Sequence, residues 1–386
     1  KFFMKKIQMV DLQSQYKKIK GEVDNAVLNV MDDATFINGP KVKSFQKKLE
    51  EYLNIKHVIP CANGTDALQI AMMGLNLMPG DEVITTNFTF AATVEVIALL
   101  RLTPVLVDVE LETFNIDCDK LEKVINNRTK AIVPVHLFGQ PANMEKIMSI
   151  AKKHKLFVIE DNAQAIGASY NFKSGLTMKT GTIGDIGATS FFPSKNLGCF
   201  GDGGALFTNN DDLAHKIRGI VNHGMYKRYH HDVVGVNSRL DSVQAAVLDA
   251  KLPHLNSYNK SRQNAAKKYT ESLQGLDEII TPKFANGCLE ICDNCHCHVF
   301  HQYTIRILNN KRDNLAKYLS DLQIPHGIYY PIPLHKQSAY VSKNYKDDDF
   351  PNTTLLCDQV ISLPMHSELE DDQINFICEK IKSFLK

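Results

Sequence analysis

The chain lacks the features that mark several broad classes of protein. Its 44 basic residues nearly balance 43 acidic residues, which leaves a net charge of +1 over 386 residues. A chain without excess positive charge is not typical of proteins that bind nucleic acids or membrane surfaces. No apolar run reaches the length of a membrane-spanning helix. We therefore expect neither nucleic acid nor a membrane as a partner.

Two sequence signatures are also missing. The first residues, KFFMKK, are not followed by the apolar segment of a secretory signal peptide. No G-x-G-x-x-G follows the first predicted strand, because CANGTDAL does not fit that pattern. The second absence argues against a nicotinamide-dependent sugar enzyme on a Rossmann fold. Nine cysteines without a secretory signal indicate reduced thiols and a cytoplasmic location.

The chain does have the length and the apolar content for a large core, with 44% of its residues hydrophobic. From about residue 40 to 210, short apolar runs alternate with helical patterns. The runs are HVIPCANG, DEVITTN, PVLVDVE, KAIVPVHLFG and KLFVIED, and the helical segments include TDALQIAMMGL, FAATVEVIALL and NMEKIMSIAKKH. This alternation predicts an α/β fold with a mostly parallel sheet flanked by helices, and an active site at the carboxyl ends of its strands.

The C-terminal third has a different organisation. Residues 245–270 predict a long helix bent at Pro253, and HVFHQYTIRI and LAKYLSDLQI then predict a strand and a helix. The last segment, DDQINFICEKIKSFL, predicts a closing amphipathic helix. We expect a large domain over residues 1–250, of which roughly the first 25 residues pack on the other domain, and a smaller α+β domain over 251–386.

One lysine, Lys195, has an unusual sequence context. The stretch TSFFPSKNLGCFGDGG, residues 189–204, sets Lys195 among small and turn-forming residues. The glycines after it let the backbone approach another group closely. A lysine held on such a loop can serve as an amine nucleophile. A surface loop with an incidental lysine explains this stretch equally well.

Polar side chains also follow the predicted strands. Asp161 ends KLFVIED, and a carboxylate at the tip of a buried strand needs a cationic partner, although a turn residue is the more common role. Gln164 follows on the same side. In ANGTDAL, Gly64 and Thr65 begin a helix whose free N–H groups suit a phosphate, to which the Ser190 hydroxyl could add a contact.

Two aromatic residues, Phe88 and Phe90, follow the strand in DEVITTN. An aromatic ring there can lie against a planar cofactor or belong to the core, and spacing does not decide between them. Taken together, the chain has a lysine, a buried carboxylate, a helix N-terminus for phosphate and an aromatic ring. These are the parts of a pyridoxal phosphate site.

These motifs resemble a known family. CANGTDAL, DEVITTNFTFAAT, PVHLFGQPANM, VIEDNAQAIGA, TSFFPSKNLGCFGDGGAL and GVNSRLDSVQAAVL are similar to the sugar aminotransferases of the DegT/DnrJ/EryC1/StrS family, in family order over roughly residues 7–385. The resemblance implies the type I pyridoxal-phosphate-dependent transferase fold. It also implies a homodimer with shared active sites.

The resemblance implies a role for each matching residue. Lys195 would hold pyridoxal 5'-phosphate covalently and carry protons, and Asp161 would keep the pyridine nitrogen protonated. The other implied cofactor contacts are Gln164 at the ring hydroxyl, Phe90 on the ring, Gly64, Thr65 and Ser190 at the phosphate, and Asn237 from the neighbouring subunit. L-glutamate would donate the amino group, leaving as 2-oxoglutarate and converting the cofactor to pyridoxamine phosphate.

Within the family, the chain looks most similar to C3 aminotransferases, including those for UDP-2-acetamido-2-deoxy-3-oxo-glucuronate in surface-polysaccharide (O-antigen or capsule) biosynthesis. The expected substrate contacts are Arg239, Arg228, His230, Tyr329, Tyr330 and His335. KRYHH is equally consistent with a solvated loop or a dimer contact. Tyr329 stands where the uronate enzymes have histidine, and it carries no positive charge at neutral pH. The alternatives are a dTDP-3-oxo-6-deoxyhexose as substrate and a non-catalytic regulator that binds pyridoxal phosphate.

A segment rich in cysteine and histidine, CLEICDNCHCHVFH at residues 288–301, raises the question of a metal. Its spacing matches no standard pattern of two plus two zinc ligands, and it reads as a loop insertion before a strand. We therefore expect no metal site.

Overall fold

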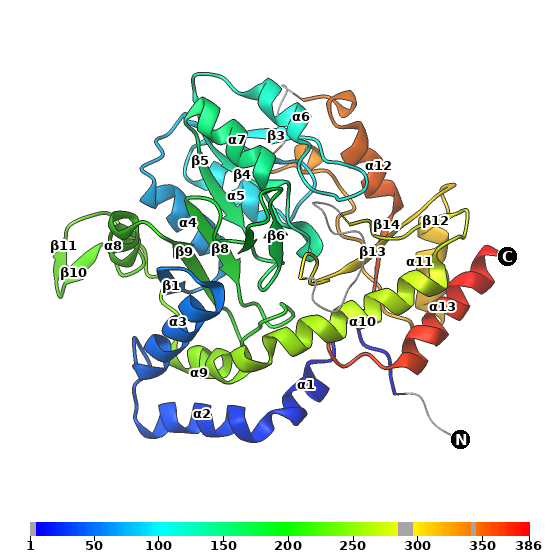
Figure 1. Cartoon of the computed structure of the whole chain (residues 1–386), viewed down its shortest axis with the longest axis horizontal. Helices are drawn as coiled ribbons and strands as arrows, with labels where there is room; N and C mark the ends of the chain where they lie inside the picture. The colour runs from blue at the N-terminus through cyan, green and yellow to red at the C-terminus, as the bar shows by residue number, and fades with distance from the viewer. Residues whose placement is uncertain (1–4, 285–295, 341–344) are drawn as a thin grey trace.

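The computed structural model describes residues 5–284, 296–340 and 345–386. Its centre is a seven-stranded sheet in the order β1-β9-β8-β5-β4-β2-β3 (Figure 1). In chain order these strands are β1 (His57–Cys61), β2 (Glu82–Thr86), β3 (Thr103–Val107), β4 (Thr129–Val133), β5 (Phe157–Asp161), β8 (Ile186–Ser190) and β9 (Gly204–Thr208). Neighbours from β8 to β3 pair in parallel, whereas β9 pairs antiparallel with both β8 and β1. The predicted mostly parallel sheet is therefore confirmed.

Helices cover both faces of this sheet. One face packs against α4 (Gly64–Gly74), α5 (Ala92–Leu99) and α8 (Asp211–Ile220). The other face packs against α3 (Pro40–Leu53), α7 (Met144–His154) and α9 (Ser242–Lys251). Val83 and Ile84 of β2 illustrate the reason, because adjacent strand residues point to opposite faces and both are fully buried.

A second, three-stranded antiparallel sheet organises the C-terminal third. It consists of β12 (Ile279–Ile280), β13 (Tyr303–Ile307) and β14 (Val360–Leu363). It packs with α10 (Leu255–Leu273), α11 (Arg312–Asp321) and α13 (Asp371–Leu385) around a separate apolar cluster, and α12 (Pro351–Gln359) precedes β14. The division into domains 1–250 and 251–386 stays a prediction, because α10 contributes Leu255 to one cluster and Leu273 to the other.

The predicted helix over residues 245–270 is interrupted where its proline stands. α9 ends at Lys251, a 3₁₀ turn spans Leu252–His254, and α10 begins at Leu255. Pro253 has no N–H to donate and its ring clashes with the preceding turn, so an uninterrupted α-helix is not available there.

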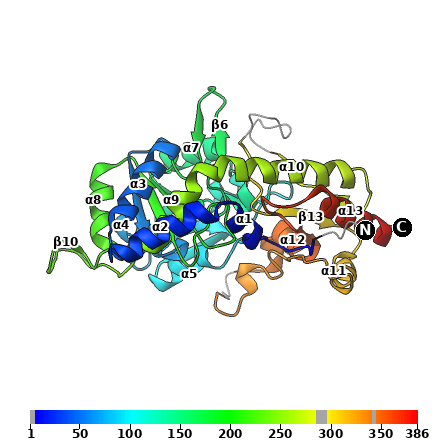
Figure 2. The same cartoon turned by 90° about the horizontal axis from the view of Figure 1, so that it is seen from below.

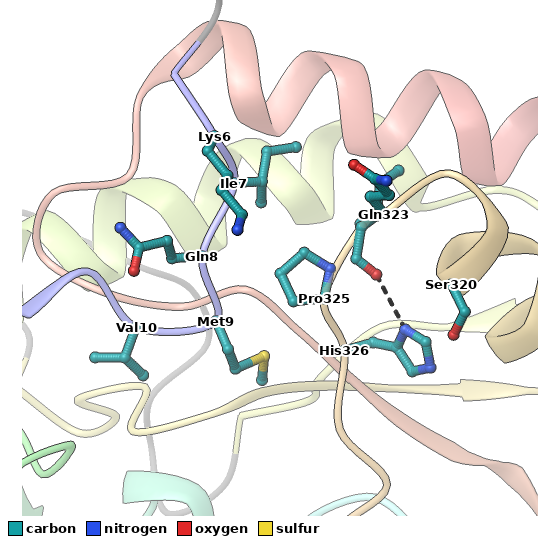
Figure 3. Close-up of a pocket in the computed structure, with 10 residues that line it drawn as sticks. Lys6, Ile7, Gln8, Met9, Val10, Ser320, Gln323, Pro325 and His326 are labelled. Atoms are coloured by element: carbon teal, nitrogen blue, oxygen red, sulfur yellow. Dashed lines mark hydrogen bonds between the residues drawn. The ribbon is translucent and has the colours of Figure 1, made fainter.

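The N-terminal segment runs along the C-terminal elements before it reaches the large sheet. Residues 6–10, 320 and 323–326 line a groove of about 630 Å³ between this segment and the end of α11 (Figure 3). The Met9 carbonyl accepts a hydrogen bond from the Met365 N–H at 3.3 Å. The chain then forms α1 (Leu12–Lys18) and α2 (Lys20–Asp32), and α2 packs on α9.

The remaining elements are small. A β-hairpin of β10 (Met225–Lys227) and β11 (His230–His231) projects at the end of the molecule opposite to α13, as Figures 1 and 2 both show. The others are α6 (Cys118–Leu121), the hairpin of β6 (Ser169–Asn171) and β7 (Thr177–Lys179), and 3₁₀ turns at Glu122–Val124, Leu137–Gly139, Leu334–Lys336 and Asp347–Asp349.

The cysteines do not all follow the prediction of reduced thiols. Cys61, Cys118, Cys199, Cys357 and Cys378 are free and buried. Cys297 is disulfide-bonded, so the prediction is wrong at this position. The remaining cysteines of the 288–301 segment, Cys288, Cys292 and Cys295, lie outside the described residues.

In residues 5–284, 296–340 and 345–386, no group of three or more His, Cys, Asp or Glu side chains is arranged to hold a metal ion. None of the helices described there is long and apolar enough to cross a bilayer.

Candidate active site

A cavity of about 840 Å³ opens where the large sheet's parallel strands end. Asp161 is the last residue of β5, Ser190 is the last of β8, and α4 starts three residues after β1. These positions meet because the carboxyl ends of parallel strands share one edge of a sheet. The cavity lining includes predicted site residues from several different sequence motifs. They are Gly64, Thr65, Phe90, Asp161, Gln164, Ser190, Lys195, Tyr329 and Tyr330.

Lys195 lies on a loop that is held closed by hydrogen bonds between backbone groups of the loop itself. The Lys195 N–H donates to the Phe192 carbonyl at 2.8 Å, and the Cys199 N–H donates to the Phe191 carbonyl at 2.8 Å. A Cβ on Gly198 would collide with the Pro193 carbonyl, so only glycine fits at that position. Desolvation lowers the pKa of Lys195 to about 8, although the charge of Asp161 opposes the shift. A substantial fraction of the amine is therefore neutral, and nucleophilic, at mildly alkaline pH.

Asp161 is a buried carboxyl group held by hydrogen bonds. The Thr93 hydroxyl donates to Oδ2 at 2.8 Å, and the Ala163 N–H donates to Oδ1 at 3.2 Å. Burial raises the pKa of Asp161, whereas these bonds and the charge of Lys195 lower it. In the described part of the chain no lysine or arginine pairs with this carboxyl at salt-bridge distance. A ligand that brings a cationic N–H to Asp161 would satisfy it.

A buried pair stands behind Asp161. The His136 Nδ1 accepts the Ala142 N–H at 3.1 Å, so His136 Nε2 is the nitrogen that donates to Glu160 at 2.8 Å. Glu160 also accepts three backbone N–H groups, from Gly181, Ile183 and Gly184. The sequence analysis did not single out this pair. It fixes the end of β5, because the His136 N–H donates to the Asp161 carbonyl at 3.0 Å.

The start of α4 forms a cradle of the kind that holds a phosphate. Asn63 caps the helix by accepting the Asp66 N–H at 2.8 Å. A Cβ on Gly64 would stand 2.6 Å from the Ser190 Cβ, so the two residues touch and only glycine is accommodated. The first N–H groups of α4 and the hydroxyls of Thr65 and Ser190 therefore lie at one end of the cavity.

The two phenylalanines separate into different roles. Phe88 is 1% exposed and packs edge-on against Phe138, as a core residue does. Phe90 is 58% exposed and lines the cavity, with its ring centroid 6.4 Å from that of Tyr330. Gln164 accepts the Phe138 N–H at 2.7 Å and donates to the Tyr330 hydroxyl at 3.2 Å, which fixes its side chain beside the cavity.

Five predicted site residues do not line this cavity. Arg228 and His230 are exposed on the β10–β11 hairpin, and Asn237 is exposed nearby. Arg239 donates to the Asn222 side chain at 2.9 Å. His335 is buried and binds Asn87 through Nδ1 at 2.7 Å. The role of Asn237 toward the cofactor and the roles of the other four residues toward a substrate stay predictions.

Sequence reasoning missed other residues of the site. Asp202, His301 and Gln302 line the cavity, and Thr93 supports Asp161. Asp202 stands in the quoted glycine-rich stretch, and His301 stands in HVFHQYTIRI. Their types were visible, but nothing local to the sequence showed that they reach the cavity.

Comparisons with known proteins agree with this geometry. The model of the DegT/DnrJ/EryC1/StrS aminotransferase family matches residues 17–382. A "Pleiotropic regulatory protein" of Geobacillus stearothermophilus is 44% identical over 98% of this chain and 99% of its own. A UDP-2-acetamido-2-deoxy-3-oxo-D-glucuronate aminotransferase of Pseudomonas aeruginosa is 44% identical over 96% and 98%. A UDP-N-acetyl-3-dehydro-alpha-D-glucosamine 3-aminotransferase of Acidithiobacillus ferrooxidans is 43% identical over 98% of both.

A solved structure extends the likeness to three dimensions. DesV of Streptomyces venezuelae, crystallised in complex with a ketimine intermediate, superposes with a TM-score of 0.92. It is 35% identical and the match covers 99% of each chain. The likeness confirms the predicted aminotransferase fold for the chain as a whole.

Proposed function

Since the chain belongs to the DegT/DnrJ/EryC1/StrS aminotransferase family, we propose that it moves an amino group from L-glutamate to the C3 keto group of a UDP-linked 2-acetamido sugar. The protein is a pyridoxal-phosphate-dependent aminotransferase. The observation that carries the proposal is the meeting of Lys195, Asp161 and the start of α4 in one cavity. An amine nucleophile, a buried carboxyl and a phosphate cradle are the groups that this chemistry requires.

The residues present fit the cofactor. Asp161 would hold the proton of the ring nitrogen, Gln164 would contact the ring hydroxyl, and Phe90 would lie against the ring. The start of α4, with Thr65 and Ser190, would bind the phosphate. When bound, pyridoxal phosphate supplies the carbonyl that takes up the amino group and a ring that spreads negative charge.

Lys195 has two tasks in this proposal. Its Nζ is the nucleophile that anchors the cofactor, and once released it is the base that moves a proton at the reacting carbon. The lowered pKa, about 8, suits both tasks because Nζ exchanges its proton readily near neutral pH. The charge on Asp161, held by Thr93 and Ala163, stabilises a cation at the ring nitrogen.

The sugar is argued from two relatives of nearly equal similarity. Both relatives are named for a UDP-linked sugar aminated at C3, and these sugars differ in the C6 group, a carboxylate in one and a hydroxymethyl in the other. The uronate is the first substrate to test, in the biosynthesis of a surface polysaccharide such as O-antigen or capsule. A cytoplasmic location is supported by five free, buried thiols among the described cysteines, whereas the disulfide-bonded Cys297 is an exception to that pattern.

A specific observation favours a second candidate with an uncharged C6. Among the described residues that line the cavity, Lys195 is the one lysine or arginine, and Tyr329 brings no charge. A neutral C6 group, as in UDP-N-acetyl-3-dehydroglucosamine or a dTDP-3-oxo-6-deoxyhexose, needs no cation. A carboxylate at C6 needs one, which the partner subunit would have to supply.

The shortage of positively charged side chains among the described cavity residues supports a homodimer with shared active sites. A nucleotide diphosphate is strongly anionic, yet this chain's cavity contains Asp66, Asp161 and Asp202. Arg228 and His230 are exposed on the β10–β11 hairpin and do not line the cavity of their own chain. They are therefore free to contact the cavity of another subunit. Exposed apolar side chains near the start of α9, Ile37 at 51% and Phe200 at 46%, are the kind of surface that a partner covers.

Single-turnover spectroscopy tests the substrate. The protein is treated with L-glutamate, freed of the excess, and mixed separately with the three keto-sugars. We expect glutamate to bleach the visible absorbance of the bound cofactor, and one UDP sugar to restore it. Restoration by the uronate requires a cation from the partner, whereas restoration only by an uncharged sugar identifies Tyr329 as a marker of a neutral C6. No bleaching by glutamate would contradict an aminotransferase and favour a regulator.

Mixed dimers test the shared site. Lys195→Ala and Asn237→Asp chains, each inactive alone, are co-expressed with different affinity tags. A mixed dimer has one intact site of two if Asn237 acts across the interface, so the purified mixed dimer should recover about half of wild-type activity per chain. Two inactive parents whose purified mixed dimer is also inactive would show that Asn237 serves its own subunit.

A further inference from the structure

His301 is a buried histidine of the cavity wall to which nothing above assigns a task. It lies just before β13 and is 6% exposed, and its exposed surface lies in the cavity that contains Lys195. Its backbone is held in place because the neighbouring Val299 and Gln302 N–H groups donate to the carbonyls of Gly139 and Phe138. The histidine ring is therefore aimed at the reaction space by the pairing of two distant segments.

The ring nitrogens of His301 have different surroundings. Nδ1 is covered and has no hydrogen-bond partner in the described structure, whereas Nε2 is not among the covered, unpartnered atoms. The edge of the ring that carries Nε2 is thus the edge that faces the cavity. An Nε2–H at this position can donate to a bound ligand.

A buried arginine lies behind this histidine. Arg262 is 3% exposed, and its Nη1 donates to the carbonyls of Phe300, His301 and Met365 at 3.0–3.3 Å. No carboxylate of the described chain pairs with it. Burial, with the charges of Lys195 and Arg262, holds the pKa of His301 well below its ordinary value. In a neutral imidazole one ring nitrogen carries the proton, so an Nε2–H leaves the lone pair on the covered Nδ1.

We propose that His301 is a substrate-positioning residue, whose Nε2–H donates a hydrogen bond to an oxygen of the keto-sugar that reacts at Lys195. This inference rests on the proposed function and names a further residue of the same site. Burial and the charges of Lys195 and Arg262 keep this imidazole neutral, so that it can act as a hydrogen-bond donor. His301 is therefore a donor to the sugar and takes no part in moving protons.

The test compares His301→Phe, which keeps a ring without the donor, with His301→Gln, which keeps a neutral donor. Losing the hydrogen bond should raise the KM of the accepted keto-sugar about tenfold, and His301→Gln should recover most of that loss. The dissociation constant of the same sugar should rise similarly, measured calorimetrically on enzyme carrying pyridoxal phosphate, where the sugar cannot be aminated. The glutamate half-reaction should be unchanged, and so should the acid limb of the kcat/KM profile.

The matched control is His326→Phe, the same exchange in the groove of Figure 3, outside the cavity. It should leave the sugar KM unchanged. Unaltered KM and binding in His301→Phe would overturn the inference. So would an equal loss in the glutamate half-reaction, which indicates a cofactor defect, or loss of the acid limb, which indicates proton transfer. If wild type aminates none of the three sugars, the proposed function fails and this inference fails with it.

Discussion

Replacing Lys195 by alanine should abolish turnover, lowering kcat by about 10⁴-fold or more, because the change removes both the nucleophile and the base. The fold should persist, because the hydrogen bonds that close this loop are donated by the backbone N–H groups of residues 195 and 199. An alanine at position 195 still has its N–H, and the substitution does not alter Cys199. Cofactor binding should also persist, non-covalently, through the cradle at the start of α4. Borohydride reduction and mass spectrometry should find the cofactor attached to Lys195 in wild type and nowhere in the variant.

Lys179→Ala is the matched control for this result. Burial lowers the pKa of Lys179 as it does that of Lys195, and its Nζ donates to the Gly167 carbonyl at 3.0 Å outside the cavity. A half-buried lysine outside the cavity should affect the melting temperature and leave kcat nearly intact. Full activity in Lys195→Ala would end the mechanism proposed for this site.

Asp161→Asn should lower kcat by about 10²- to 10³-fold, because a neutral amide cannot stabilise a cation at the ring nitrogen. The same variant should make the cofactor-free protein more stable at pH 8. Burial raises the pKa of Asp161 above its unfolded value, so the folded state holds this proton more tightly than the unfolded state. The ionised carboxyl therefore costs stability at a pH above that raised pKa, and asparagine removes the cost.

The pH dependence separates this explanation from a general change in packing. As the pH falls from the raised pKa of Asp161 to the unfolded value of about 3.9, the cost of ionising the folded carboxyl is lost, so the melting temperatures of wild type and Asp161→Asn should converge. Thermal unfolding of the cofactor-free proteins from about pH 8 down to about pH 4 measures this. A constant difference across that range, or undiminished kcat, would contradict the role given to Asp161.

Much of the large sheet was predictable because its signals are local. A strand such as β5 is a short run that contains Val and Ile and ends in a carboxylate. The start of α4 is indicated by the Asn63–Gly64 turn, which precedes an apolar helical pattern. The glycines after Lys195 likewise reflect a local demand, since Gly198 faces the carbonyl of Pro193 five residues earlier. The break between α9 and α10 follows from Pro253 in the same way.

Other features depend on contacts that sequence spacing does not contain. Phe88 and Phe90 are equivalent in pattern, yet Phe88 is enclosed by Phe114 and Phe138 whereas Phe90 borders the cavity. Thr93 reaches Asp161 across 68 residues of sequence. His301 joins the site only because its segment pairs with residues 138 and 139.

By itself, the sequence determined the chemical class, because Lys195, Asp161 and the Gly64–Thr65 turn each carry their chemistry in residue type and local backbone. Only the tertiary structure decided which groups surround the reaction. It assigned Phe88 to the core, brought His301 into the cavity wall with Arg262 behind it, and left Arg228 and His230 outside the lining of the cavity. The physical reason is that charge, burial and hydrogen-bond partners are set by neighbours in space, and a parallel sheet brings together residues that lie far apart along the chain.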